Sequence, residues 1–139
     1  MSRGFLRRRA DEERRKSSML REISSRYDGL TVMLFGSRAR GEHTAASDYD
    51  LIVIYDDPDE LRSFKEELKK ERIPADLHCF TLREAIELLR SSTVLLDALE
   101  EGIVLREGIA LEPLREEMGR LKGKGYRRVK GGWIIPSAD

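Results

Sequence analysis

The chain has 139 residues, of which 40% are hydrophobic and 37% charged, a size and balance that predict one globular domain with a highly charged surface. Its 26 Lys and Arg offset 26 Asp and Glu, so bulk charge favours no particular class of partner. A single cysteine, Cys79, excludes an internal disulfide and fits a reducing compartment. With no signal-like segment and no apolar run of membrane-spanning length, we expect a soluble protein of the cytoplasm.

The spacing of apolar residues predicts an alternation of helices and strands. Helical periodicity marks amphipathic helices, and nearly continuous apolar runs mark strands that are covered on both faces. We expect, in chain order, a helix over 11–27, strands over 30–35 and 49–55, a helix opening at 57, a strand over 75–80, a helix opening at 81, a short apolar segment over 94–99, an edge strand over 103–105 and a helix over 111–121. This order predicts the α/β (α+β) class, a mixed sheet with helices packed on it.

Two of the expected helices carry capping signals at their start. Asp57 precedes Pro58 and is followed three residues later by Glu60, and Thr81 is followed three residues later by Glu84. Each pair predicts a capping box, in which each side chain accepts a hydrogen bond from the backbone N–H of the other residue.

Three aspartates are the strongest candidates for chemistry. Asp48 and Asp50 lie two residues apart at the start of the second strand, so they project from the same face. Two close carboxylates raise each other's pKa unless a cation lies between them, and magnesium prefers such oxygen ligands. Asp76 lies in the otherwise apolar third strand, where an unpaired buried carboxylate would be costly. We therefore expect the three carboxylates to meet and form one metal site.

The segment between the first two expected strands carries a phosphate-binding pattern. Gly36 ends the first strand and allows close approach to a ligand, and Ser37 can cap a short helix that begins with Arg38. Free N–H groups at a helix start bind anions, and Arg38 and Arg40 add positive charge there. A phosphate-binding loop beside a metal site suits nucleoside triphosphate chemistry.

Residues 36–51, GSRARGEHTAASDYDL, closely resemble the minimal nucleotidyltransferase signature of the DNA-polymerase-β-like superfamily. That signature is Gly-Ser, ten residues, then Asp-x-Asp, and here residues 38–47 supply the ten. The Ala-Arg-Gly at 39–41 and the Ser-Asp at 47–48 match its commonest form. Either part alone would be weak, whereas the joint pattern between a strand, a helix and a strand is specific.

The resemblance extends over roughly residues 30–105 and includes the later strand aspartate, Asp76. Tyr49 and Ile52 replace the more usual branched aliphatic residues, which leaves the mechanism untouched. The resemblance implies the polymerase-β-like nucleotidyltransferase fold for this part of the chain.

The resemblance also implies a transferase that uses ATP and two magnesium ions. Asp48 and Asp50 would bind both ions, and Asp76 would hold one of them beside the acceptor hydroxyl, as ligand or base. That hydroxyl would attack the α-phosphorus in line and pyrophosphate would leave. Asp48, Asp50 and Asp76 are thus the expected catalytic and metal-binding residues.

Four further residues would bind the nucleotide on the same resemblance. Gly36 and Ser37 would hold the β- and γ-phosphates. Arg38 and Arg40 would contact phosphate or the acceptor, although an arginine such as Arg40 can instead brace the loop.

Other conspicuous residues receive structural interpretations. His78 shares the face of Asp76 and could touch the site, but we favour a packed or solvent-facing side chain. His43 is expected in a solvated loop, and Cys79 in the core. The Arg7-Arg8-Arg9 run is expected to be a solvated or frayed start.

Residues 123–139 are expected to form a basic, aromatic-containing tail that follows a nucleotidyltransferase domain at 1–122. No acidic residue lies between Gly119 and Ala138, where lysines and arginines surround Tyr126 and Trp133. Such interleaving can bind single-stranded nucleic acid. We favour contact with a partner or with the chain itself, because the apolar Trp-Ile-Ile would otherwise be left in water.

The acceptor is the least determined part of the hypothesis. The chain is too short to carry the extra domains by which larger members of the superfamily hold acceptors. Stand-alone minimal members resemble antitoxins that adenylylate a tyrosine of an all-helical HEPN ribonuclease toxin, which is the leading hypothesis. The alternatives are a small hydroxyl metabolite or an RNA end as acceptor, and a non-catalytic nucleotide-binding subunit. Self-association stays open, and no membrane partner is expected.

Overall fold

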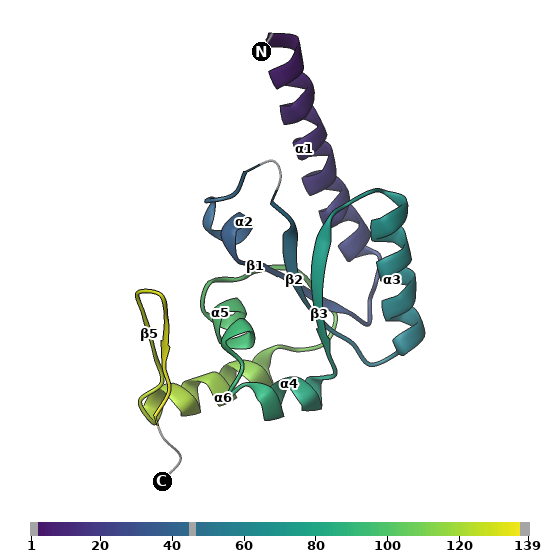
Figure 1. The fold of residues 1–139 in the computed structure, drawn as a ribbon. Coiled ribbons are helices and arrows are strands. Elements are labelled where there is room, and N and C mark those ends of the chain that lie inside the picture. The colour runs from purple at the N-terminus through teal and green to yellow at the C-terminus, as the bar shows by residue number, and fades with distance from the viewer. Residues whose placement is uncertain (1–2, 45–46, 137–139) are drawn as a thin grey trace.

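The computed structural model describes residues 3–44 and 47–136 (Figure 1). In chain order the elements are α1 (Arg3–Ser25), β1 (Thr31–Phe35), α2 (Ser37–Arg40), β2 (Tyr49–Ile54), α3 (Pro58–Lys70), β3 (Ala75–Phe80), α4 (Leu82–Leu88), α5 (Thr93–Glu101), β4 (Ile103–Glu107), α6 (Glu112–Gly123), β5 (Arg127–Val129) and β6 (Gly132–Ile134). Residues 45–46 of the signature segment and 137–139 of the predicted tail lie outside the described residues.

The expected strands and helices are confirmed, with one difference at the N-terminal end. The first helix, α1, begins at Arg3 rather than near residue 11, so Arg7-Arg8-Arg9 is helical and exposed, not frayed. The first half of α1 projects from the rest of the molecule (Figure 1). No helix in the described part of the chain combines the length and apolarity that crossing a membrane requires.

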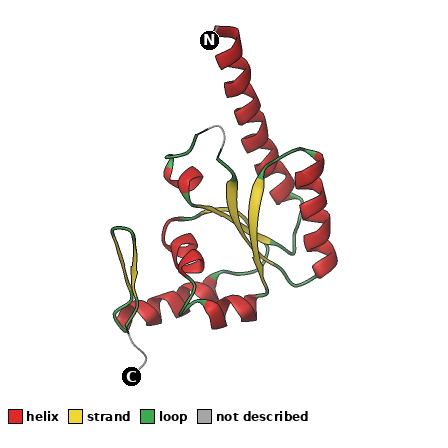
Figure 2. Cartoon of the chain, viewed as in Figure 1, coloured by secondary structure: helices red, strands yellow, loops and turns green. Residues whose placement is uncertain are grey.

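The main sheet has four strands in the order β3-β2-β1-β4. Strand β1 is antiparallel to both β2 and β4, whereas β2 and β3 run parallel to each other. The sheet is therefore mixed, as predicted, with β3 and β4 at its edges. Figure 2 shows the helices that flank it.

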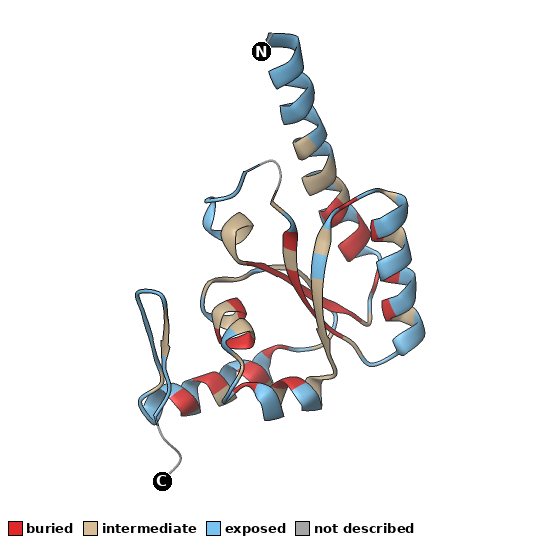
Figure 3. Cartoon of the chain, in the orientation of Figure 1, coloured by how far each residue is buried: buried red, intermediate tan, exposed pale blue. Residues whose placement is uncertain are grey.

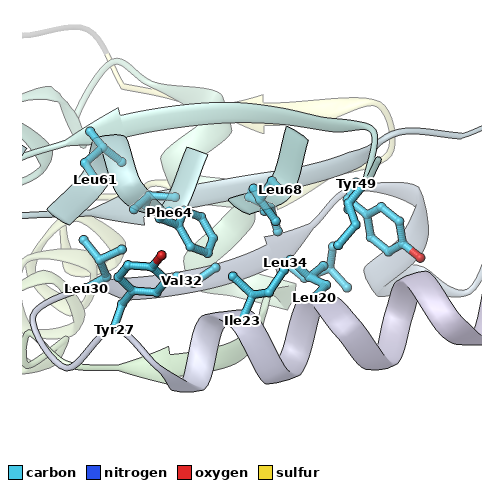
Figure 4. Packing of buried hydrophobic residues seen from close by; sticks show 13 residues of the cluster. Leu20, Ile23, Tyr27, Leu30, Val32, Leu34, Tyr49, Leu61, Phe64 and Leu68 are labelled. Carbon is cyan, nitrogen blue, oxygen red and sulfur yellow. The ribbon is translucent and has the colours of Figure 1, made fainter. Parts of the chain in front are cut away.

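One face of the sheet is covered by α1 and α3 (Figure 4). Its buried residues are Leu20, Ile23, Tyr27, Leu30, Val32, Leu34, Tyr49, Leu51, Val53, Leu61, Phe64, Leu68 and Ile73. They come from alternate positions of β1 and β2 and from one stripe of each helix. Each large aliphatic side chain buried here stabilises the fold by roughly 1.5–3 kcal/mol.

The opposite face is covered by α4, α5 and α6. Its buried residues are Met33, Phe35, Ile52, Ile54, Ala85, Leu89, Leu95, Leu96, Ala98, Leu111, Leu114, Met118 and Leu121. The two clusters make a three-layered arrangement in which the central strands are buried on both sides (Figure 3). The nearly continuous apolar run of β1 follows from this double burial.

The predicted capping box at the start of α3 is wrong. The Asp57 side chain caps the helix and accepts a hydrogen bond from Asp59 N at 2.9 Å. The Glu60 carboxylate, however, accepts from Gly29 N at 3.2 Å instead of from Asp57 N. Glu60 therefore links α3 to the turn before β1. The local sequence pattern could not reveal this long-range hydrogen bond.

The predicted capping box at the start of α4 is confirmed. Glu84 N donates to Thr81 Oγ1 at 3.2 Å, and Thr81 N donates to Glu84 Oε1 at 2.9 Å. Ala85 and Leu89 are fully buried, whereas Leu88, the last residue of α4, is exposed.

The described part of the predicted tail folds back on the domain as a hairpin, β5–β6. The Tyr126 hydroxyl donates to Arg90 O, and Trp133 Nε1 donates to Asp97 Oδ1, each at 2.8 Å. Both rings also pack against the cluster under α4–α6. Of the two favoured contacts, with a partner or with the chain itself, the structure shows self-contact for Tyr126 and Trp133, whereas Ile134 and Ile135 are exposed. The division at residue 122 stays a prediction, since α6 continues to Gly123.

Candidate active site

The pairing of β2 with β3 brings the predicted carboxylates to one end of the sheet. In this parallel register Asp50 lies opposite Asp76, and Ile52 lies opposite His78. Asp48 lies two residues before Asp50, just ahead of β2. The apolar cluster on this face reaches Ile52. Asp50 therefore faces the same side of the sheet as Ile52 and lies just past the end of that apolar cluster.

The three carboxylates differ in their exposure to solvent. Asp50 is half-buried, whereas Asp48 is exposed and the Asp76 side chain is 62% exposed. The expectation that Asp76 needs a cation because it is buried is wrong, since β3 is an edge strand. Asp76 lies beside Asp50 because the two residues are paired in the parallel register of β2 and β3.

The electrostatics of Asp50 favour a cation at this end of the sheet. Burial raises the pKa of Asp50, as do the neighbouring carboxylates of Asp76 and Asp48, while His78 and Arg40 act in the opposite direction. A bound cation would relieve both the burial penalty and the carboxylate repulsion.

The donor set at this end of the sheet fits magnesium, which takes oxygen ligands from one or two carboxylates together with water and phosphate. Within residues 3–44 and 47–136, no three His, Cys, Asp or Glu side chains already converge as a metal site. The metal-binding roles of Asp48, Asp50 and Asp76 therefore stay predictions.

His78 is packed on one side, as the favoured interpretation expected, and also lies next to Asp76. Its Nε2 is 3.5 Å from Asp76 Oδ2, and its ring meets the Phe35 ring edge-on with centroids 5.7 Å apart. The side chain is 32% exposed, so it is packed on one side and open on the other. The two-residue alternation of a strand had indicated this proximity.

Gly36 brings the backbone close to the Asp50 carboxylate. It lies at the N-terminal end of α2 with φ 75°, a left-handed conformation that favours glycine. A Cβ at this position would be 2.5 Å from Asp50 Oδ2. The residue therefore has to be glycine for the loop and the carboxylate to share this space.

Ser37 is the first residue of α2 rather than its cap. Gly36 takes the N-cap position, and no side chain caps this helix, so the expected capping by Ser37 is wrong. Helix α2 is a single turn, closed by hydrogen bonds from Arg40 N to Gly36 O and from Glu42 N to Ser37 O. The serine hydroxyl is thus not engaged in capping, and a role in phosphate binding stays a prediction.

Arg38 braces the loop that leads to Asp48. Its Nε and Nη2 donate to Ser47 O at 3.0 and 2.9 Å, and its Nη1 pairs with Glu13 Oε1 at 3.1 Å. The guanidinium lies 3.9 Å from the centre of the Tyr49 ring, and the side chain is only 6% exposed. This is the bracing role that the sequence assigned to Arg40, and contact of Arg38 with a nucleotide stays a prediction.

Arg40 lies on the open side of the loop. Its Nη1 is 2.8 Å from Glu101 Oε1, and its Nε is 3.1 Å from Glu42 Oε2. It lies near enough to Asp50 to lower that carboxyl group's pKa. Glu101, at the end of α5, was not predicted, and no local motif marks it.

The remaining conspicuous residues conform to their structural interpretations. His43 is exposed, as expected, and its Nε2 lies 3.1 Å from Glu13 Oε1. Cys79 is half-buried on the face opposite His78, and burial raises the pKa of its thiol. Neither residue belongs to the carboxylate end of the sheet.

Two hollows border the first half of α1. Their volumes are about 320 and 350 Å³, and Arg38 and Glu13 line both. None of the three aspartates lines either hollow. The three carboxylates lie outside these hollows, at one end of β2 and β3.

The chain matches one family model and one solved structure. The family described as "Nucleotidyltransferase domain" matches residues 16–106, which contain the whole site and most of the sheet. No curated protein matches the chain. A solved structure titled "Crystal structure of the toxin-antitoxin with AMP-PNP" has 19% sequence identity and a TM-score of 0.46, over 79% of this chain and 87% of that one.

Proposed function

The chain belongs to the nucleotidyltransferase domain family, and we propose that it moves AMP from ATP to an acceptor hydroxyl in a magnesium-dependent reaction. One observation carries the proposal. The parallel register of β2 and β3 sets Asp76 opposite Asp50, at the place where Gly36 brings the loop backbone against the Asp50 carboxylate.

Asp48 and Asp50 are the proposed metal ligands. Asp50 is half-buried and its pKa is raised by burial and by Asp76, so it gains most from a neighbouring cation. Bound magnesium would supply charge stabilisation for the attacking and leaving oxygens. Asp48 is exposed beside it and can turn to the same ion.

The loop after β1 is the proposed phosphate-binding element. Because Gly36 has no Cβ, the loop backbone can lie against the Asp50 carboxylate, where a Cβ would be 2.5 Å from Oδ2. The Ser37 hydroxyl takes no part in capping α2, and Arg40 carries positive charge on the same side. These groups would hold the triphosphate with its α-phosphorus toward the carboxylates.

Asp76 is the proposed acceptor-side residue. Its carboxylate is exposed on the edge strand, so an incoming hydroxyl can reach it. In the reaction the hydroxyl oxygen bonds to the α-phosphorus, the bond to the β-phosphate oxygen breaks, and pyrophosphate leaves. Asp76 would accept the hydroxyl proton or orient the hydroxyl for attack.

The proposed acceptor is a tyrosine of a HEPN-type ribonuclease, which adenylylation would silence. The family resemblance suggests this acceptor, and the openness of the Asp76 side of the site suits a large one. Added negative charge near a nuclease site would obstruct RNA there. A small hydroxyl metabolite, an RNA end and a non-catalytic role are the competing outcomes.

The test is to mix the protein with radiolabelled ATP, magnesium and the product of the adjacent gene. We expect label on a tyrosine of that protein, none with Asp48→Asn, and normal labelling with the control Asp59→Asn, an exposed aspartate on α3. Label on RNA ends or on a small molecule would refute the antitoxin role alone. A folded protein that binds ATP but transfers nothing to any acceptor would refute catalysis.

A further inference from the structure

We propose that Arg128 of the C-terminal hairpin is a positioning residue for the nucleotide site, because it holds Glu101 when Arg40 leaves that carboxylate for the triphosphate. This inference rests on the proposed function. It adds the β5–β6 hairpin, which lies outside the residues that match the family, to the machinery of the site.

Glu101 is shared by two arginines from opposite ends of the chain. Its Oε1 lies 2.8 Å from Arg40 Nη1, and its Oε2 lies 2.9 Å from Arg128 Nη1. Each arginine thus occupies its own carboxylate oxygen, so one can leave without displacing the other. Arg40 comes from the signature segment and Arg128 from β5.

The Glu101 carboxylate needs a permanent cationic partner. Its side chain is only 22% exposed, and removing one partner of a desolvated pair leaves a charge that is costly to keep. Burial acts to raise the pKa of Glu101, but the hydrogen bonds from Arg40 and Arg128 together hold it below its usual value. Both arginines therefore stabilise the charged carboxylate.

The hairpin is anchored so that Arg128 stays in place. Trp133, which pairs with Arg128 across the two strands, donates from Nε1 to Asp97 Oδ1 at 2.8 Å. Arg128 Nη1 itself lies 3.6 Å from the same Asp97 oxygen. Asp97 is one turn before Glu101 on α5, so the helix presents both carboxylates to the hairpin.

Arg40 is the mobile member of the pair in this proposal. Its side chain is 35% exposed, and it lies close enough to Asp50 to influence that carboxyl group. A triphosphate above the carboxylates would compete with Glu101 for Arg40. With Arg128 present, Glu101 keeps a counter-ion when Arg40 moves. Without Arg128, Arg40 would be the remaining partner of Glu101 and would be held back from the nucleotide.

The test compares dissociation constants for ATP and AMP, measured by calorimetry with magnesium. We expect Arg128→Ala to weaken ATP binding by roughly threefold to fivefold, the range of a partly exposed ion pair. AMP binding should not change, because AMP lacks the phosphates that draw Arg40 away. The control Arg127→Ala, an exposed position of the same strand, should bind both nucleotides normally.

A second substitution separates this role from damage to the hairpin. Adding Glu101→Gln to Arg128→Ala removes the carboxylate that holds Arg40, and should restore ATP affinity to the wild-type value. Unchanged ATP affinity in Arg128→Ala, no recovery in the double variant, or an equal loss for AMP would each overturn the positioning role while leaving the transferase standing. A wild-type protein that does not bind ATP would overturn both.

Discussion

Along β2, Tyr49, Leu51 and Val53 face α1 and α3, whereas Asp50 and Ile52 face α4, α5 and α6. On the first side the apolar cluster continues to the very start of the strand. On the second side it stops at Ile52, and a carboxylate follows. One strand therefore closes a core on one face and carries the candidate site on the other.

The difference shows how the site obtains a rigid base. Tyr49 is buried under the Arg38 guanidinium, which also holds the loop before Asp48 through Ser47 O. The closed face thus fixes the backbone from which Asp48 and Asp50 project. Rigid support beneath exposed functional groups is what preorganised catalysis requires.

The largest expected effect comes from the open face alone. Asp48→Asn together with Asp50→Asn should abolish pyrophosphate release and strongly weaken Mg-ATP binding, because both proposed metal ligands lose their charge. The melting temperature should not fall, since neither carboxylate belongs to an apolar cluster. Calorimetry and circular dichroism check the two halves of this prediction. Unchanged Mg-ATP affinity would show that the metal-site assignment is wrong.

The matched control is the neighbouring position on the closed face. Leu51→Ala removes a fully buried side chain and should lower the free energy of unfolding by roughly 2–5 kcal/mol. The protein that remains folded should still bind Mg-ATP normally. A loss of affinity as large as that of the double aspartate variant would mean that the two faces do not divide structure from function.

A smaller effect is expected from Asp76→Asn. Because Asp76 lies on the exposed edge, next to the proposed acceptor rather than the triphosphate, turnover should fall by about 10²-fold while ATP affinity changes far less. Single-turnover kinetics and calorimetry separate the two quantities. Full turnover would remove Asp76 from the mechanism and direct attention to His78, whose Nε2 is 3.5 Å from it.

The smallest effect is expected from Gly36→Ala. At φ 75° and ψ −154° the backbone lies in a region that only glycine adopts readily, which costs a residue with a Cβ roughly 1–3 kcal/mol, and that Cβ would meet Asp50 Oδ2. We expect a modest fall in thermal stability and weaker ATP binding, because the loop or the carboxylate must shift. Ala39→Gly, at the third residue of α2, provides the control for altered loop flexibility. A variant with unchanged affinity would show that this close approach is not needed.

Much of the molecule was predictable because its signals are local. Apolar periodicity located the strands, whereas Asp48 lies just ahead of β2, where the strand alternation that was expected to place it beside Asp50 does not apply. The signature segment identified Gly36, whose close approach to Asp50 the structure explains. These features depend on residues close together in the sequence, where geometry follows from spacing.

The missed features depend on partners that are distant in sequence. Glu60 of α3 accepts a hydrogen bond from Gly29 N, and Arg38 forms an ion pair with Glu13 of α1. Glu101 forms ion pairs with both Arg40 of the signature segment and Arg128 of the hairpin. No spacing rule marks such pairs, because they arise only when the layers assemble. The exposure of Asp76 was missed because it follows from the position of β3 at the edge of the sheet. The order of strands in a sheet cannot be deduced from the sequence of one strand.

The edge position of β3 has a further consequence, for self-association through the sheet. An unpaired strand edge is a template for adding strands from other chains, and proteins counter this by placing charge there. Asp76, with the adjacent His78, puts polar side chains on β3, and β4 ends in Arg106 and Glu107 at the opposite edge. The carboxylate proposed to receive the acceptor thus also discourages edge-to-edge aggregation, and replacing it by a neutral residue would weaken that protection as well as lower the proposed turnover.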